Sequence, residues 1–156
     1  IRTKSMNHLF INLLPIYKWL SFAGNIKGDQ SKVELSKTLL EEEVKELFDG
    51  INNDNNTEII DACCDIIWIL MNVLFYRGVD LLDFKKYFNK VKESNYSKFC
   101  TSEFEAKTTQ ALYKTGDHPD KPGEMIETIV EKVGTYYVIK RLDGKVLKSA
   151  YYKKLL

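Results

Sequence analysis

The chain has 156 residues, of which 44% are hydrophobic and 29% are charged, and its formal net charge is +1. These values are typical of one soluble globular domain. They lack the basic excess of a protein that covers nucleic-acid phosphates, so no nucleic acid is expected as a partner. The longest apolar run, Ile66–Tyr76, is interrupted by Asn72. It is shorter than the roughly 20 residues of a membrane-spanning helix, so no membrane association is expected.

The cysteines are few and do not form a recognisable framework. Cys63 and Cys64 are adjacent, Cys100 is distant, and no C-x-x-C pair is present. This spacing disfavours a disulfide framework or a zinc knuckle. We therefore expect three small buried hydrophobic side chains in a reducing compartment, and a cytoplasmic location.

The first part of the chain predicts two long helices. Ser31 with Glu34 three residues later forms a capping-box pattern, which begins a helix that we expect to end at Gly50. The sequence "INNDNN" is predicted to be a loop. Thr57 is a plausible N-cap for the second helix, and Gly78 is a plausible left-handed residue after its end.

The second part predicts two more helices and a hairpin. A helix is expected from Asp80 to about Lys92, and the capping-box pattern Ser102–Glu105 opens another that ends near Gly116. Asp143 and Gly144 form a strong hairpin-turn signal inside a β-rich tail. The sequence therefore predicts an all-α bundle with a C-terminal β-hairpin.

Several carboxylates of the two long helices fall on faces that should be buried. At 100° per residue, Glu43 and Glu46 lie inside the apolar arc of the first helix, whereas Glu42 lies towards solvent. The second helix is apolar nearly all round, as expected of a fully packed central helix. Its polar residues share one narrow stripe: Glu58, Asp61, Asp65, Asn72 and Tyr76.

These acids predict a metal site. A short loop makes the two helices antiparallel neighbours, so Glu43 and Glu46 can face Asp61 and Asp65. Burying ionised carboxylates together costs several kcal/mol unless a cation compensates. Oxygen ligands suit Mg²⁺, or alternatively Mn²⁺, and the cluster has room for one or two ions. The alternative is that both acidic runs are ordinary solvated helix faces.

Histidine and tryptophan are two other residue types that could contribute to a site. Neither His8 nor His118 stands three residues after a glutamate, which argues against a ferritin-like di-iron site. We expect these histidines in the N-terminal segment and in a loop, without a catalytic role. Trp19 is either a stacking partner for a nucleobase or an aromatic residue of the core.

The acidic segments resemble the all-α nucleoside triphosphate pyrophosphohydrolase superfamily of MazG-like and phosphoribosyl-ATP-pyrophosphatase-like proteins. The motif E-E-x-x-E is present as Glu42, Glu43 and Glu46, and Asp65 matches the aspartate of a following E-x-x-D motif. The position three residues before Asp65 is Ala62 instead of glutamate. The fourth ligand must then come from a neighbouring acid, either Asp61 or Glu58.

A second part of the resemblance lies further along the chain. The segment "SNYSK" is similar to the family's S-N-x-S-K, in which Asn and Lys contact the substrate, here Asn95 and Lys98. The tail "DGKVLK" resembles the D-G-K-x-x-K of many dimeric members, which makes Lys145 and Lys148 candidates for binding phosphates. The resemblance covers residues 31–98 well and 143–151 in part.

The resemblance implies a fold, an activity and a set of site residues. It implies a single domain over residues 1–156, with core helices at about 31–98 and a C-terminal extension with a hairpin at about 134–152. The implied activity is Mg²⁺-dependent cleavage of a nucleoside triphosphate, NTP or dNTP, to monophosphate and pyrophosphate by a homodimer or tetramer. The implied metal ligands are Glu43, Glu46, Asp61 and Asp65. The implied catalytic residues are Glu42, Glu43, Glu46 and Asp65, and the implied substrate-binding residues are Asn95, Lys98 and Lys145, with Trp19 as a candidate.

Two alternatives stay open at the level of sequence. One is a different hydrolase on the same acidic site, acting on nucleoside diphosphate-linked substrates or alarmones. The other is a catalytically inactive helical metal-binding or interaction module of the same fold, which the Ala62 departure allows.

Overall fold

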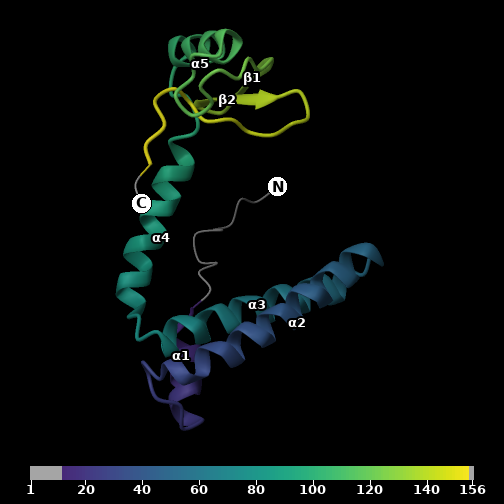
Figure 1. Cartoon of the computed structure of the whole chain (residues 1–156), viewed down its shortest axis with the longest axis vertical. Coiled ribbons are helices and arrows are strands. Elements are labelled where there is room, and N and C mark those ends of the chain that lie inside the picture. Colours follow the sequence, from purple (N-terminus) through teal and green to yellow (C-terminus); the bar gives the residue numbers. More distant parts are fainter. Residues whose placement is uncertain (1–11, 155–156) are drawn as a thin grey trace, which may run out of the picture. The chain divides into compact units, whose positions relative to one another are not determined.

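A computed structural model describes residues 12–154 (Figure 1). Its elements are, in order, α1 (Leu14–Phe22), the short 3₁₀ helix η2 (Gln30–Lys32), α2 (Val33–Asn52), α3 (Asn56–Tyr76), α4 (Leu81–Tyr96), α5 (Glu103–Thr115), β1 (Thr128–Val133) and β2 (Tyr136–Arg141). The predicted all-α bundle with a C-terminal β-hairpin is confirmed. The chain divides between Phe84 and Lys85 into two compact units, which we call the N-terminal and C-terminal units.

The N-terminal unit is built on the antiparallel pair of α2 and α3, which lie side by side (Figure 1). The prediction that Gly50 ends this helix is wrong, because Gly50 lies buried within α2. A Cβ added at Gly50 would lie 3.2 Å from the Ile59 side chain and from its backbone nitrogen. The missing side chain therefore allows α3 to approach α2 closely, and the helix continues to Asn52 because it is packed there.

Both predicted caps of these helices were placed wrongly. Asp29 accepts hydrogen bonds from the Ser31 backbone nitrogen (3.1 Å) and hydroxyl (2.6 Å), so it begins η2 and leaves α2 without a side-chain cap. At α3 the N-cap is Asn55, whose Oδ1 accepts from the Glu58 backbone nitrogen at 3.3 Å, and not Thr57. In each case a short polar side chain two residues before the predicted cap accepts a backbone hydrogen bond and acts as the cap. Gly78 has the predicted positive φ, 77°.

The core of the N-terminal unit joins α1 to the C-terminal half of α3. Its buried members are Ile16, Tyr17, Leu20, Met71, Phe75 and Tyr76. Tyr17 packs edge-to-face on Phe75 with ring centroids 5.2 Å apart, and its hydroxyl donates to the Val79 carbonyl at 2.8 Å. The polar tips of the aromatic residues are thus satisfied while their rings are buried.

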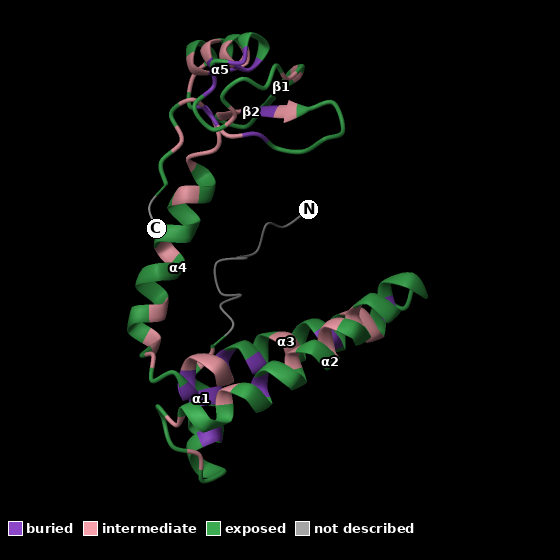
Figure 2. Ribbon diagram, in the orientation of Figure 1, coloured by how far each residue is buried: buried purple, intermediate pink, exposed green. Residues whose placement is uncertain are grey.

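Much of the apolar surface of α2 and α3 is exposed in this chain (Figure 2). The prediction that α3 is fully packed is therefore wrong for the described residues, because α1 and α2 cover only part of its circumference. Cys63 and Cys64 are likewise exposed, and only Cys100 is buried as predicted. The exposed large apolar residues of the pair are Leu35, Leu39, Phe48, Ile51, Ile60, Ile67, Trp68 and Leu70.

By length and composition, α3 could cross a membrane, with 21 residues and a mean hydropathy of 1.8. This is weak evidence, because the core helix of a soluble protein passes the same test. Its buried residues pack against α1 and α2. The absence of membrane association stays a prediction.

In the C-terminal unit, α5 packs against the antiparallel hairpin of β1 and β2. The core consists of Cys100, Ala106, Tyr113, Ile139 and Leu147. The predicted N-cap of α5 is confirmed by the Ser102 hydroxyl, which accepts from the Glu105 backbone nitrogen at 3.2 Å. The Glu105 carboxylate accepts from the Thr101 backbone nitrogen at 2.6 Å, and not from Ser102 as a capping box requires. The helix ends as predicted at Gly116, which has a φ of 78°.

The hairpin turn is not where the sequence placed it. Val133 pairs with Tyr136, so Gly134 and Thr135 connect the two strands. The predicted turn at Asp143–Gly144 instead reverses the chain a second time, after β2, and there the Leu147 backbone nitrogen donates to the Ile139 carbonyl at 2.8 Å. The β-branched residues that flank Gly134 provide two full strands, whereas only a short irregular segment follows Gly144.

The loop after α5 buries His118, and His8 lies outside the described residues. The His118 ring stacks on Tyr113 with centroids 3.8 Å apart, and its Nδ1 accepts from the Asp120 backbone nitrogen at 3.1 Å. Its Nε2 is buried without a hydrogen-bond partner among the described residues. Burial lowers the pKa of His118, although the nearby Asp120 carboxylate opposes this shift.

We expect the free energy of unfolding to fall as the pH drops below the ordinary histidine value of 6.5. In the unfolded chain His118 is protonated near pH 6.5, whereas in the folded chain its protonation requires a lower pH. Chemical denaturation at pH 7.5 and 5.5 measures this loss. His118→Phe keeps a ring against Tyr113 and should reduce the pH dependence. A variant with the pH dependence of the unmodified chain would contradict the assignment.

Candidate active site

The antiparallel packing of α2 and α3 gathers carboxylates around Glu43. The Glu43 side chain is half-buried, and its Oε2 is buried without a hydrogen-bond partner among the described residues. Burial raises the pKa of Glu43 above its ordinary value of 4.5. Neighbouring negative charges raise this pKa further, in the order Glu46, Asp65, Asp61 and Glu42. The charges of the acids that the sequence selected therefore act on Glu43.

These neighbours differ from Glu43 in burial. Glu42 is exposed, as predicted from its phase on the helix. Glu46 is also exposed, contrary to its predicted place in the buried arc. Asp61 and Asp65 are exposed on α3. The reason is geometric, because α3 covers a narrow stripe of α2, and Glu46 lies at the edge of that stripe, not at its centre.

The described residues do not contain a preassembled metal constellation. Nowhere in residues 12–154 do three Asp, Glu, His or Cys side chains converge closely enough to hold an ion. Ionised carboxylates repel one another, so they spread apart unless a cation draws them together. The donor set nevertheless fits a hard divalent cation, because it consists of oxygen atoms and includes the unpartnered Oε2 of Glu43.

The geometry distinguishes the two candidates for the fourth acid. Ala62, which stands where the motif has glutamate, is buried. Glu58 is engaged at the start of α3, where its Oε2 accepts from the Asn55 side-chain amide at 3.1 Å. Asp61, in contrast, is one of the charges that raise the pKa of Glu43. The structure therefore favours Asp61 over Glu58 as the partner of Glu43.

One polar residue near this face was not assigned a role from the sequence. Asn72 lies seven residues after Asp65 on α3, and a separation of seven residues returns to nearly the same face of a helix. Its Oδ1 is buried without a hydrogen-bond partner among the described residues. The available signal was its place in the polar stripe of an otherwise apolar helix.

Trp19 is a surface residue and not part of the core. It lies on α1 with 53% of its surface exposed. Its ring packs edge-to-face on Trp68 of α3, with centroids 5.7 Å apart. Two half-exposed indoles thus form a small aromatic surface on the N-terminal unit.

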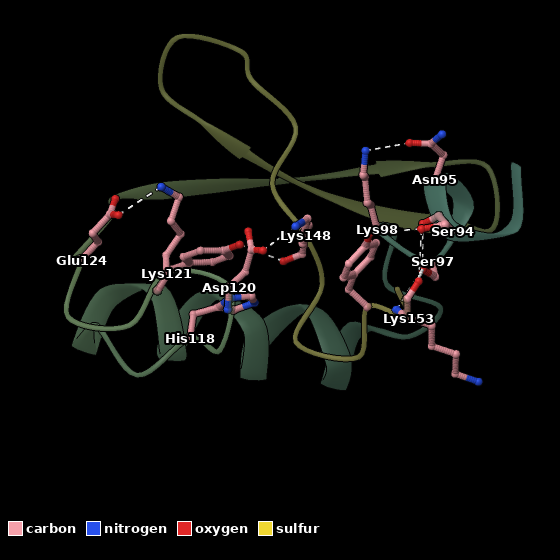
Figure 3. Close-up of polar contacts among 12 residues, drawn as sticks. Ser94, Asn95, Ser97, Lys98, His118, Asp120, Lys121, Glu124, Lys148 and Lys153 are labelled. Carbon is pink, nitrogen blue, oxygen red and sulfur yellow. Dashed lines mark hydrogen bonds and ion pairs between the residues drawn. The ribbon is translucent and has the colours of Figure 1, made fainter. Parts of the chain in front are cut away.

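The C-terminal unit holds the other predicted substrate-binding residues, of which Figure 3 shows Asn95 and Lys98. Lys98 donates from Nζ to Asn95 Oδ1 at 2.7 Å, so the structure brings these two side chains together. Lys145 lies in the Asp143–Gly144 turn, where its backbone nitrogen donates to Asp143 Oδ1 at 3.2 Å. Lys148 forms an ion pair with Asp120, which leaves it less available to a phosphate than Lys145.

Residues 25–95 match the family model of phosphoribosyl-ATP pyrophosphohydrolase, which is part of the MazG-like superfamily. The resemblance to this family is confirmed. An uncharacterised protein of Acanthamoeba polyphaga mimivirus is 37% identical over 67 residues. That match covers 43% of this chain and 26% of the viral protein, so the chain corresponds to about a quarter of that relative. The family match includes every acid around Glu43 and ends at Asn95, so Lys98 and Lys145 lie beyond it.

We expect Glu43→Gln to raise the melting temperature of the metal-free protein at pH 7–8. The raised pKa of Glu43 means that its ionised form destabilises the folded state, and an amide removes that charge. The difference between variant and unmodified chain should shrink as the pH falls through the raised pKa of Glu43 and should be lost below 4.5, because Glu43 is then protonated in both states. Thermal unfolding in EDTA measures the effect. The exposed Glu41 of the same helix provides the control Glu41→Gln, which should give a smaller shift at pH 7–8.

Proposed function

We propose that the protein is a Mg²⁺-dependent nucleoside triphosphate pyrophosphohydrolase that converts an NTP or dNTP to its monophosphate and pyrophosphate. The observation that carries this proposal is the half-buried Glu43, whose unpartnered oxygen lies in the field of four further carboxylates. Such an arrangement is unfavourable in the absence of a cation, and it occurs inside the region that matches a pyrophosphohydrolase family. A role in control of the cytoplasmic nucleotide pool would follow.

The proposed metal ligands are Glu43, Glu46, Asp61 and Asp65, with Mn²⁺ as a possible substitute for Mg²⁺. The bound ion would neutralise negative charge that develops on the phosphate oxygens in the transition state. Metal binding would also give Glu43 Oε2 the partner that it lacks among residues 12–154. Glu43 therefore has a second role, because its shifted pKa makes metal binding compete with protonation.

The proposed reaction is the attack of a water molecule on phosphorus. Glu42 or Glu46 would orient the water and accept its proton. A bond forms between the water oxygen and phosphorus, and the bond between the α- and β-phosphates breaks, which yields monophosphate and pyrophosphate. Asn95 would donate a hydrogen bond to the substrate, and Lys98 and Lys145 would contribute positive charge to phosphate oxygens. Trp19 would stack on the base.

The exposed apolar surface of α2 and α3 supports a homodimer or tetramer. Isolated apolar side chains on a surface are ordinary, but here eight large ones lie on two adjacent helices. A second copy of the chain would cover them and complete the packing that α3 lacks.

One specific observation supports the alternative of an inactive module. Ala62 replaces a motif acid and is buried. In the proposed enzyme, Asp61 supplies the carboxylate that is absent at Ala62. Pyrophosphate release separates these two functions, and product analysis also separates the proposed enzyme from hydrolases that release phosphate.

We expect Glu43→Gln and Asp65→Asn each to reduce pyrophosphate release by about 10²-fold or more, because each removes a charge that stabilises the transition state through the ion. A panel of NTPs and dNTPs with Mg²⁺ provides the assay. Asp61→Asn should reduce turnover more than Glu58→Gln does. Circular dichroism should show unchanged helix content in all four variants.

Full turnover in Glu43→Gln or Asp65→Asn would refute the mechanism. Addition of millimolar Mg²⁺ should also raise the melting temperature of the unmodified chain by relieving carboxylate repulsion. This shift should be smaller in Glu43→Gln. An unmodified chain whose melting temperature does not respond to Mg²⁺ would favour the solvated-face interpretation of the acids.

We expect light scattering to give at least twice the mass of one chain. Ile60→Lys places a charge on the exposed apolar face of α3 and should weaken association by about tenfold or more. Phe104→Lys changes an equally exposed residue of α5 and serves as the control. A monomeric unmodified chain at micromolar concentration would contradict the oligomer.

A further inference from the structure

The C-terminal end of α4 is bonded to a segment near the end of the described chain, Ser149–Lys153, which we call the tail segment (Figure 3). The Ser149 backbone nitrogen donates to the Lys98 carbonyl at 2.9 Å. The Lys153 backbone nitrogen donates to the Ser97 hydroxyl at 3.0 Å. Two backbone groups of the tail segment therefore bond to the stretch that carries Asn95 and Lys98.

The hydroxyl groups of Ser94, Ser97 and Tyr152 form a connected series of hydrogen bonds between the end of α4 and the tail segment. The Ser97 hydroxyl donates to the Ser94 carbonyl at 2.8 Å while it accepts from Lys153. The Ser94 hydroxyl lies 3.2 Å from the Lys153 carbonyl and 3.0 Å from the Tyr152 hydroxyl. If Ser94 donates to the carbonyl, Tyr152 donates to Ser94, and every proton in the group has one acceptor. Such a connected network fixes its members more firmly than separate bonds would.

The tail segment is itself fixed to the body of the C-terminal unit. The Ala150 backbone nitrogen donates to the hydroxyl of the buried Thr109 on α5 at 3.0 Å. Lys148 forms its ion pair with Asp120 and lies 4.6 Å from the centre of the Tyr152 ring. The Tyr113 hydroxyl donates to the Lys148 carbonyl at 3.0 Å. The position of Tyr152 is therefore set by α5 and its following loop.

We propose that the tail segment is a positioning element, in which Ser94, Ser97 and Tyr152 hold the end of α4 so that Asn95 and Lys98 are oriented together for a triphosphate. This inference rests on the proposed function, which assigns substrate binding to Asn95 and Lys98. The three positioning residues act through the helix end and do not themselves touch the substrate. The bond between Lys98 Nζ and Asn95 Oδ1 is the arrangement that they preserve.

The physical need for such an element follows from where Asn95 lies. The last carbonyl groups of a helix have no partners within the helix, and its last turn frays easily. A long lysine side chain on a fraying turn samples many positions, and binding must then order it at an entropic cost. Bonds from the tail segment to the Lys98 carbonyl and to Ser97 remove this freedom before the substrate arrives.

The test measures binding of tripolyphosphate, with Mg²⁺ present, to the full chain by calorimetry. Tyr152→Phe keeps the ring beside Lys148 and removes only the hydroxyl, and it should weaken binding by about threefold to tenfold. Ser97→Ala should weaken binding at least as much, and Ser97→Thr should restore it. Tyr151→Phe is the matched control, because Tyr151 is an exposed neighbour whose side chain lies outside this network.

A double-mutant cycle separates positioning from general stability. In a Lys98→Met background, Tyr152→Phe should have little further effect on tripolyphosphate binding, because the residue through which it acts is gone. Equal effects in both backgrounds, or unchanged binding in Tyr152→Phe and Ser97→Ala, would overturn the inference. So would an unmodified chain that does not bind tripolyphosphate. If the chain binds tripolyphosphate but releases no pyrophosphate from any nucleotide, the proposed function fails while the cycle still decides the positioning role.

Discussion

The close antiparallel packing of α2 on α3 is the constraint on which the rest of the N-terminal unit depends. Gly50 permits it, because a side chain there would meet Ile59 at 3.2 Å. The same packing brings Glu43 against α3, where burial and the charges of Asp65 and Asp61 act on it. A carboxylate in such a place destabilises the metal-free protein. Folding stability and cation binding are thereby linked through one side chain, and loss of that side chain should affect them in opposite directions.

The C-terminal unit solves a different physical problem. The helix α4 is followed by a short stretch, Ser97–Cys100, whose backbone bonds to the tail segment and to the hairpin. Lys98 is bonded through its carbonyl to Ser149, and the adjacent Cys100 pairs with Tyr137 of β2. The family match ends at Asn95, so this support lies in the part of the chain beyond it. The proposed function thus depends on residues that the family match does not reach.

Several features were predictable because their causes are local. The N-cap of α5 and the positive φ of Gly78 and Gly116 depend on a few adjacent residues. Helical phase also placed Glu43 on a partly covered face, which the structure confirms. Two errors have a local cause. Asp29 caps η2 ahead of Ser31, and Asn55 caps α3 ahead of Thr57.

The sequence by itself determined the helical class, the acidic motif and the family resemblance, because periodicity, caps and motif spacing depend on neighbouring residues. Only the tertiary structure decided that Gly50 lies inside α2, that Glu46 is exposed while Glu43 is half-buried, and that the charge of Asp61 acts on Glu43. It also decided that Gly134, and not Gly144, lies in the turn between β1 and β2. The reason is that coverage of a side chain depends on the width and position of the partner element. That partner is distant in the sequence, and no local pattern encodes how much of a helix face it covers.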